Sequence, residues 1–145
     1  MKRDLRFEWL YPNTPAEVWE CLTTPELIGK WLMQNDFKLE LGAVFQFQAK
    51  PMPGWSGIVD CRVLEIVPQR KLSYTWVSGP TPGSDKISTT VTWTLIPEKA
   101  GTRLILEHTG FTGFRAWMTS FLLGSGWKSH IAKAFADLLP KKKVS

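Results

Sequence analysis

The stretch from Val91 to Phe111 alternates apolar and polar residues in two runs, with a turn-forming segment between them. This period of two is typical of half-buried strands, so the stretch predicts a β-hairpin. One face of the hairpin is apolar apart from a single imidazole, and its residues are Val91, Trp93, Leu95, Leu104, Leu106 and His108. A helical pattern follows Phe111. We therefore expect a curved sheet that grips a helix and covers a ligand-sized interior.

The same alternation predicts strands before the hairpin. A first strand is expected over about residues 3–11. The strand pattern returns from Phe37 onward, with Phe45 and Phe47 on one face of AVFQFQAK, and breaks at 51–54. Further strands are expected over 57–67 and 70–77. Short turns separate these later runs, with no helix-length crossover between them. Consecutive strands joined in this way indicate an antiparallel meander, so we predict a curved antiparallel sheet of about six to seven strands.

Two short helices are predicted between the first strand and the rest of the sheet. Thr14 is a candidate N-cap, and Glu17 lies three residues later, which is the signature of a capping box for a helix over 15–22. Thr24 precedes a second proline-initiated segment, which predicts a helix over 25–31. The fold class is therefore α+β.

The C-terminal third has helical periodicity. A first apolar stripe consists of Phe114, Trp117, Met118, Phe121 and Leu122, and a glycine-containing break follows at 124–126. A final helix is predicted from near Ser125, and its stripe consists of Trp127, Ile131, Ala134, Phe135 and Leu138. Pro140 ends this helix. We expect a long C-terminal helix that lies across the sheet.

Length and composition indicate one domain over 1–145, with basic ends at 1–3 and 140–145 that we expect to be mobile. The net charge of +5 lies largely at these ends, so it favours solubility over nucleic-acid binding. Cys21 and Cys61 lack metal or disulfide spacing, which indicates a reduced compartment. No secretory signal and no run of roughly 18 apolar residues is present, so we expect a cytoplasmic protein without a membrane span.

The polar residues do not form a recognisable catalytic or metal-binding pattern. His108 and His130 have no second metal ligand at helical spacing. Asp60 and Glu107 alternate outward with their strands, which does not favour a paired acid and base. We therefore expect no metal, no cofactor and no enzymatic activity.

Four blocks in order carry a resemblance to a known family. They are TPAEVWECLTTPELIGKWL, GIVDCRVLEIVPQRKLSYTW, VTWTLIPEKAGTRLILEHTGF and the GW pair that opens the last helix. Together they resemble the START-like helix-grip superfamily, also called SRPBCC, and within it the branch named for the activator of heat-shock protein 90 ATPase. The resemblance spans about 6–139 and implies a β-α-α-β-β-β-β-β-β-α order with an apolar cavity between sheet and C-terminal helix.

Members of this superfamily bind lipids, polyketides and flavonoid-like molecules, so the resemblance implies a hydrophobic ligand. The candidate cavity-lining residues are Trp31, Phe45, Phe47, Val59, Cys61, Tyr74, Trp76, Val91, Trp93, Leu104, Leu106, His108, Trp117, Phe121, Trp127, Ile131 and Phe135. Periodicity alone does not distinguish a cavity wall from a filled core. In the cavity interpretation, Tyr74 and His108 supply hydrogen bonds; in the core interpretation, which we favour for His108, that histidine has partners within the protein.

The leading functional hypothesis is a non-enzymatic module that binds a hydrophobic small molecule, in a role connected with stress. The alternative is a co-chaperone that interacts with a chaperone and stimulates its ATPase. A cyclase or hydrolase-like enzyme is a third hypothesis. The segment 114–126 is interpreted first as core, and otherwise as a lid or a membrane-surface contact. The sequence does not indicate an oligomeric state.

Overall fold

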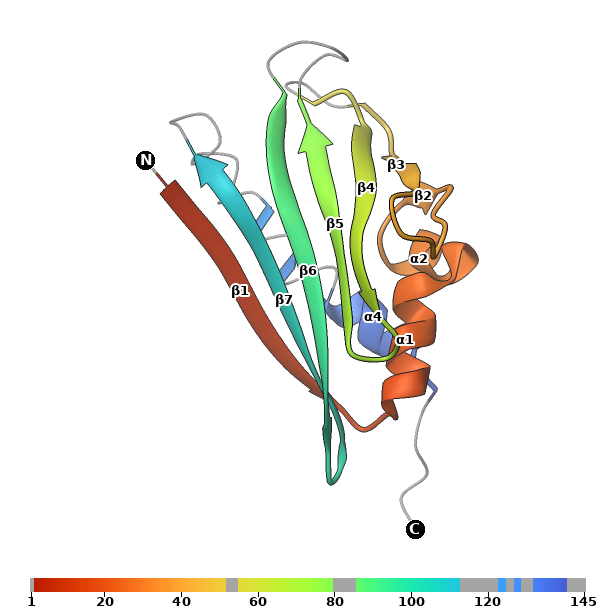
Figure 1. Ribbon diagram of the computed structural model, residues 1–145. Coiled ribbons are helices and arrows are strands. Elements are labelled where there is room, and N and C mark those ends of the chain that lie inside the picture. The colour runs from red at the N-terminus through yellow and green to blue at the C-terminus, as the bar shows by residue number, and fades with distance from the viewer. Residues whose placement is uncertain are drawn as a thin grey trace.

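The computed structural model describes residues 2–51, 55–79, 86–112, 123–124, 127–128 and 132–140. They form an α+β fold in which one curved sheet lies against short helices (Figure 1). The elements in chain order are β1 (Lys2–Tyr11), α1 (Pro15–Thr23), α2 (Pro25–Trp31), β2 (Gln34–Asn35), β3 (Val44–Gln48), β4 (Ile58–Val67), β5 (Lys71–Ser78), β6 (Ile87–Glu98), β7 (Gly101–Thr112) and α4 (Ala132–Leu138). This order is the one that the resemblance implied.

The strands form one antiparallel sheet of seven strands in the order β1-β7-β6-β5-β4-β3-β2. The strands from β2 to β7 follow one another as a meander, and β1 joins at the far edge beside β7. Helices α1, α2 and α4 lie on one side of the curved sheet (Figure 1). We call the side of the sheet that faces these helices the inner face and the opposite side the outer face.

The predicted hairpin is β6 and β7, and its register places the apolar residues opposite one another. Val91 pairs with His108, Trp93 with Leu106, and Leu95 with Leu104. All of these side chains are buried. Alternation therefore predicted both the strands and the inner face correctly, because the side chains of successive residues in a strand point to opposite faces.

The two helices after β1 begin as their sequence signals predict. The Thr14 side chain accepts a hydrogen bond from the Glu17 backbone N–H at 3.2 Å, and the Glu17 carboxylate accepts one from the Thr14 N–H at 3.0 Å. This capping box satisfies backbone groups that the first turn of α1 leaves without helical partners. Both α1 and α2 also have a proline in the first turn.

A close backbone approach at the start of β7 joins three distant segments. A Cβ on Gly101 would overlap the carbonyl oxygen of Tyr11, and its φ of 151° also favours glycine. Next to it, the Thr102 hydroxyl donates to the Asn13 carbonyl at 2.6 Å, and the Asn13 side chain donates to the Pro140 carbonyl at 2.5 Å. The end of β1, the start of β7 and the end of the described chain therefore meet at one point.

The C-terminal region differs from the sequence-based expectation. The predicted long helix from near Ser125 is not evident, because the α-helix that the structure describes there is the seven-residue α4. Trp127 and Lys128 lie in a π-helical turn, whereas residues 125–126 and 129–131 are outside the described residues. The apolar period predicted which face meets the core, but it does not determine the type of helical turn. The predicted stripe at 114–122 also lies outside the described residues.

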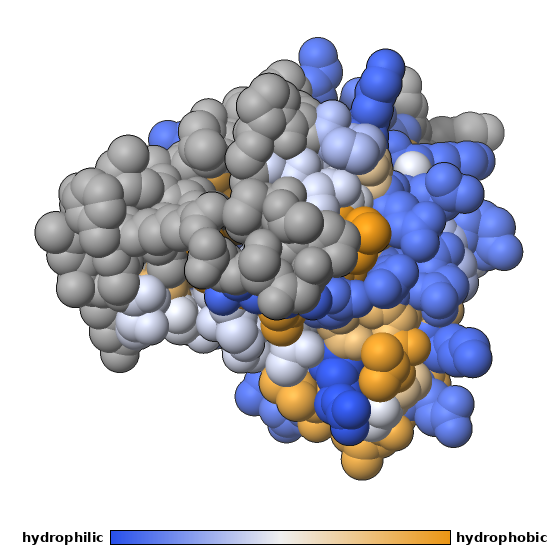
Figure 2. Space-filling view, turned by 90° about the horizontal axis from the view of Figure 1, so that it is seen from above, coloured by the Kyte–Doolittle hydropathy of each residue, from blue (hydrophilic) through white to orange (hydrophobic). Residues whose placement is uncertain are grey.

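The exposed surface of the sheet is mixed, because apolar side chains such as Leu10, Val44 and Ile96 are exposed on it beside charged ones. Strand pairing extends to Lys2, which pairs with Thr112. Seen from above, hydrophilic side chains cover much of the described surface, and hydrophobic ones gather on a smaller part of it (Figure 2). None of the helices in the described part of the chain is long and apolar enough to cross a membrane.

Candidate functional site

The predicted lining residues gather on the inner face and in the elements that cover it. Every one that the structure describes is at most 4% exposed: Trp31, Phe45, Phe47, Val59, Cys61, Tyr74, Trp76, Val91, Trp93, Leu104, Leu106, His108, Trp127 and Phe135. The remaining predicted lining residues, Trp117, Phe121 and Ile131, lie outside the described residues. The candidate site is therefore a continuous apolar layer between the sheet and the C-terminal segment.

Trp127 and Phe135 bring the C-terminal segment onto the sheet. The Trp127 ring centroid lies 5.7 Å from that of Trp76 and 5.6 Å from that of Trp93. The ring centroids of Phe135 and Trp31 of α2 are 5.1 Å apart, and those of Trp31 and Trp93 are 5.6 Å apart. The near-perpendicular ring pairs have the edge-to-face geometry that aromatic quadrupoles favour. The two faces predicted to enclose the site are thus in direct contact here.

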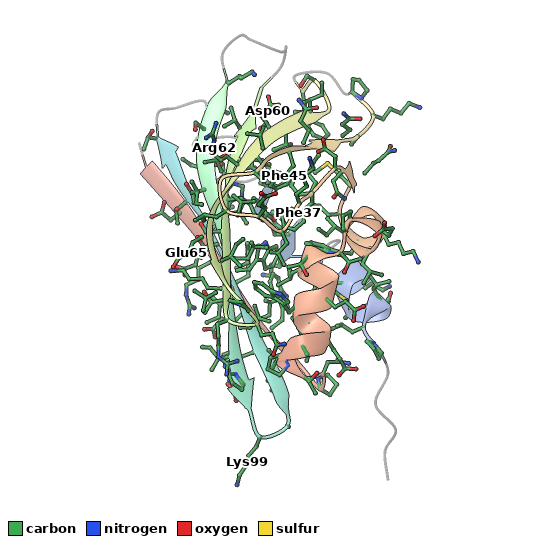
Figure 3. The ribbon with its side chains drawn as sticks, turned by 45° about the vertical axis from the view of Figure 1, so that its right-hand side comes forward. Phe37, Phe45, Asp60, Arg62, Glu65 and Lys99 are labelled. Atoms are coloured by element: carbon green, nitrogen blue, oxygen red, sulfur yellow. The ribbon has the colours of Figure 1, made fainter. Side chains whose placement is uncertain are left out.

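A second group of rings covers the β3 side of the inner face. Phe45 and Phe47 lie on β3, and their ring centroids are 5.3 Å and 6.1 Å from that of Tyr74. Phe37 packs on Phe45 at 4.9 Å. Phe37 and Phe45 point toward the interior between the sheet and the helices, whereas Arg62 lies on the outer face (Figure 3). The aromatic layer therefore extends from β3 to the C-terminal segment.

His108 is fully buried and has a partner at each ring nitrogen. The Trp127 indole N–H donates to His108 Nδ1 at 3.1 Å, and His108 Nε2 lies 2.7 Å from the Thr89 hydroxyl oxygen. An indole nitrogen can only donate, so Nδ1 is the acceptor and Nε2 carries the proton of the neutral ring. The Thr89 hydroxyl then donates to the Trp76 carbonyl at 3.0 Å. We call this sequence of hydrogen bonds the His108 chain.

Burial keeps His108 neutral. Removal from water penalises the imidazolium form and lowers the pKa of His108 to about 3. Protonation of Nδ1 would also place two donors, the imidazolium N–H and the Trp127 N–H, against each other. His108 is therefore the satisfied core histidine that we favoured from the sequence, and its hydrogen-bonding capacity is used within the protein.

Tyr74 and Trp93 form a second buried polar pair. The Trp93 indole N–H donates to the Tyr74 hydroxyl oxygen at 3.0 Å. Burial raises the pKa of Tyr74, so this hydroxyl keeps its proton at neutral pH. The two residues lie on neighbouring strands, where the register pairs Tyr74 with Val91 and Leu72 with Trp93.

A family model agrees with this architecture. The model described as "Activator of Hsp90 ATPase homolog 1-like protein" matches residues 12–140. The chain belongs to this family. None of the curated proteins compared with it matches.

Several solved structures share the fold of this family member. Protein MLL2253 from Mesorhizobium loti is 34% identical, with 94% of this chain and 96% of that chain covered at a TM-score of 0.80. CalU16 from Micromonospora echinospora is 24% identical, with 97% and 78% covered and a TM-score of 0.74. DynU16, a protein in the dynemicin biosynthetic locus, is 21% identical, with 92% and 46% covered and a TM-score of 0.70. The family member thus has the START-like helix-grip architecture.

Sequence reasoning missed several inner-face residues of this family member. Phe37 is 4% exposed, and it lies before β3 where no strong alternation marks it. Phe7 and Trp9 on β1 stack with a centroid distance of 5.9 Å, and both are only partly buried. A Cβ on Gly124 would lie 3.9 Å from the Phe7 ring, so the C-terminal segment also approaches β1. The alternation of β1 was a sufficient signal for including Phe7 and Trp9.

The nucleophilic and charged groups in the described residues are poorly placed for chemistry at this layer. Burial is the main cause that raises the pKa of the Cys21 thiol to about 11, and it also raises that of Cys61. Both thiols therefore stay protonated and are weak nucleophiles. Asp60 lies on the outer face. Its carboxylate accepts a hydrogen bond from Gln46 Nε2 at 2.6 Å and forms an ion pair with Lys86 Nζ at 3.2 Å. The part of the chain that the structure describes contains no group of three residues suited to a metal ion.

Proposed function

We propose that this protein binds a hydrophobic small molecule between the inner face of the sheet and its C-terminal segment, without catalysing a reaction. The observation that carries the proposal is the continuous aromatic layer, which includes Phe45, Trp76, Trp93, Trp127 and Phe135. Apolar contact at such a surface contributes about 25 cal/mol for each Å² removed from water. A lipid-like, polyketide-like or flavonoid-like molecule suits this chemistry, and a cytoplasmic, stress-related role belongs to the same proposal.

The ring contacts constrain how a ligand enters. Trp127 touches both Trp76 and Trp93, so these rings leave no gap between them for a flat molecule. A ligand must lie beside this cluster or displace the ring of Trp127 from the sheet. Displacement of Trp127 also breaks its hydrogen bond to His108. Binding is therefore expected to alter the indole N–H signal of Trp127 in an NMR spectrum.

The comparisons support the proposal at the level of fold. DynU16 is a protein in a biosynthetic locus, and its fold is shared with this chain. The proposal for this chain rests on its own aromatic layer, with the shared fold as secondary support.

An NMR titration tests the proposal. We would add laurate, flavone and fluorenone separately to ¹⁵N-labelled protein and follow the backbone amides and the eight tryptophan indoles. Saturable shifts are expected on inner-face strands and at the Trp127 indole, with outer-face residues such as Thr92 unchanged. Absence of a saturable inner-face shift with all three probes would refute ligand binding of this type.

A co-chaperone function is the second candidate, and the family description favours it. In that case the protein would use a surface to contact a chaperone and stimulate its ATPase. The discriminating measurement is the ATPase rate of a purified Hsp90 with increasing concentrations of this protein. A saturable rise in the rate, together with no inner-face shift in the titration, would reverse the order of the two candidates.

A further inference from the structure

Three large aliphatic side chains are exposed near one end of the outer face. Leu10 of β1 is 55% exposed, and Val67 of β4 and Ile96 of β6 are each 41% exposed. Leu10 and Ile96 lie in one cross-strand row, because both of them pair with Arg103 of β7. Val67 lies in the next row, on the other side of β6. Exposed aliphatic groups that gather in this way are a feature of interaction surfaces.

The charges of the outer face are balanced within the sheet. Arg6 and Glu8 of β1 form an ion pair at 2.6 Å, and Lys71 of β5 forms one with Glu65 of β4 at 3.1 Å. Glu65 points away from the helices (Figure 3). From Leu5 onward, the outer face of β1, β7, β6, β5 and β4, together with the adjoining Lys86, carries as many basic as acidic residues: Arg6, Arg62, Lys71, Lys86 and Arg103 against Glu8, Asp60, Glu65, Glu98 and Glu107.

This balance differs from the charge of the whole chain. The chain has a net charge of +5, whereas the outer face of these five strands is neutral. Two copies of the chain can therefore approach each other through this face with little of the repulsion that their net charges cause.

The two ion pairs of β1 and of β4 with β5 have opposite polarity on the two sides of β6. The sheet order makes β6 the middle strand of these five. The row that contains Arg6 on β1 reaches Glu65 on β4, and the adjacent row contains Glu8 on β1 and Lys71 on β5. Each row thus has one charge on one side of β6 and the opposite charge on the other. A half turn about an axis along β6 exchanges the positive and negative ends of each row.

We propose that two copies of this chain associate through their outer faces, with a twofold axis that runs along β6. Arg6 of one copy then faces Glu65 of the second copy, and Glu8 faces Lys71 of the second copy. Each contact occurs twice, because an interface between two identical copies uses the same surface on both.

The apolar end of the face closes under the same symmetry. Ile96 lies on β6 and therefore meets Ile96 of the second copy at the axis. Leu10 and Val67 lie on strands at equal distances from β6, so Leu10 approaches Val67 of the second copy. Removal of these aliphatic groups from water supplies a favourable contribution that exposed ion pairs alone do not supply.

The size of the face suits a weak dimer. Five strands about 4.8 Å apart and four rows about 6.8 Å apart give an area of roughly 650 Å² on each copy, or about 1,300 Å² in total. Specific interfaces bury about 1,200 to 2,000 Å². The sheet curves around the helices, so contact is closest along β6 (Figure 1). We therefore expect a dissociation constant of about 10 to 100 μM.

The reversed polarity favours a second copy over an unrelated partner. An exposed sheet face that is merely solvated gains from cross-strand ion pairs, but it does not require opposite polarity on the two sides of its middle strand. A partner of one charge sign would meet as many repulsive as attractive groups on this neutral face. A second copy supplies the matching pattern at every one of the four charged positions.

Sedimentation velocity of the full chain tests the proposal. Over concentrations from about 5 μM to about 1 mM, the average mass should rise from 16.5 kDa toward twice that value. Arg6→Glu and Glu65→Arg should each weaken the association about tenfold, because each places like charges at two symmetric contacts. The two substitutions change the net charge in opposite directions, so general repulsion does not explain a loss that both of them cause.

The double variant Arg6→Glu, Glu65→Arg provides the sharper test. It restores opposite charges between the copies, so its dissociation constant should return to within about threefold of the original value. Within one copy, residue 6 then repels Glu8 and residue 65 repels Lys71. Recovery can therefore come only from the contact between copies.

A matched pair of variants tests the apolar end. Ile96→Lys brings two ammonium groups together at the axis and should weaken the association at least about tenfold. Val44→Lys is the control, because Val44 is a 59% exposed aliphatic residue on β3, outside the five strands of the proposed contact. This control should retain the association. Circular dichroism of each variant at low concentration confirms that it is folded.

Four results would overturn the proposal. They are the mass of a single chain at every concentration, an association that Val44→Lys weakens as much as Ile96→Lys does, an association that the double variant does not recover, and binding of a monomeric chain to purified Hsp90 that Ile96→Lys abolishes. The last result would assign the outer face to the chaperone. None of the four concerns the inner face, so the ligand titration tests the proposed function separately.

Discussion

His108 and Tyr74 occupy equivalent places on the inner face but differ in how their polar atoms are used. Both flank Val91 in one cross-strand row, since Val91 pairs with His108 on one side and with Tyr74 on the other. Both are buried, at 0% and 3% exposure. His108 uses both ring nitrogens inside the protein, whereas Tyr74 takes part through its hydroxyl oxygen.

The difference shows that burial alone does not identify a binding residue. From the sequence, the imidazole was the more conspicuous polar group of the apolar face, and the phenol was a second hydrogen-bonding candidate in the cavity interpretation. In the structure, the imidazole is a fixed part of the core that connects β6 with the C-terminal segment. The phenol instead accepts a hydrogen bond from the Trp93 indole N–H on the neighbouring strand. Three measurements test this comparison.

The largest expected effect follows the loss of the histidine. His108→Leu would leave the Trp127 indole N–H without an acceptor and remove the bond to Thr89. We expect the free energy of unfolding to fall by about 2 to 4 kcal/mol, which combines one orphaned donor with one lost hydrogen bond. Urea denaturation measures this value. A loss below about 0.5 kcal/mol would mean that the His108 chain contributes little to stability.

An acid titration of stability is the second measurement. His108 stays neutral in the folded protein down to a pKa of about 3, whereas in the unfolded chain it takes up a proton below about pH 6.5. The unfolded state therefore binds more protons between these values, and the free energy of unfolding falls as the pH decreases through this window. Between pH 6.5 and about pH 5, this histidine should lower the free energy of unfolding by about 1 to 2 kcal/mol.

His108→Gln provides the comparison for that titration. The glutamine side chain can donate and accept hydrogen bonds but does not titrate. The free energy of unfolding of the variant should therefore fall less between pH 6.5 and about pH 5, by the amount that the histidine contributes. Carboxylates contribute to acid unfolding in both proteins and cancel in the difference. Parallel profiles for the two proteins would show that His108 is protonated in the folded state as readily as in the unfolded one.

The smallest of the three effects is expected at the tyrosine. Tyr74→Phe removes one oxygen and leaves only the Trp93 indole N–H without its acceptor. We expect the free energy of unfolding, measured by urea denaturation, to fall by about 1 kcal/mol. A loss as large as that of His108→Leu would show that the two residues are used alike, and the comparison would fail.

The fold was predictable because its signals are periodic and local. The alternation of Val91, Trp93 and Leu95 determined the inner face of β6, and the Thr14 and Glu17 pair marked the start of α1. The π-helical turn at Trp127 was not predictable, because an apolar stripe specifies a face without specifying the hydrogen-bonding pattern of the turn.

The residues of the candidate site could be predicted from the sequence, but the hydrogen bonds between them could not. The predicted lining residues that the structure describes are buried, because the strand period places them on one face. The Trp93 bond to Tyr74 and the Trp127 bond to His108 each join residues 19 positions apart on different elements. Such contacts depend on strand register, helix docking and side-chain rotamers together. Sequence periodicity therefore identified Tyr74 as a candidate without revealing its hydrogen bond with Trp93.

The fixed tautomer of His108 makes this residue a built-in spectroscopic reporter. Its Nδ1 accepts from an indole and its Nε2 carries a buried proton, so the two ring nitrogens should have clearly different ¹⁵N resonances. Movement of Trp127 away from the sheet would change the Nδ1 resonance first, whereas a change around Thr89 would affect the Nε2 proton. One unmodified side chain thus records on which side of the aromatic layer the protein rearranges.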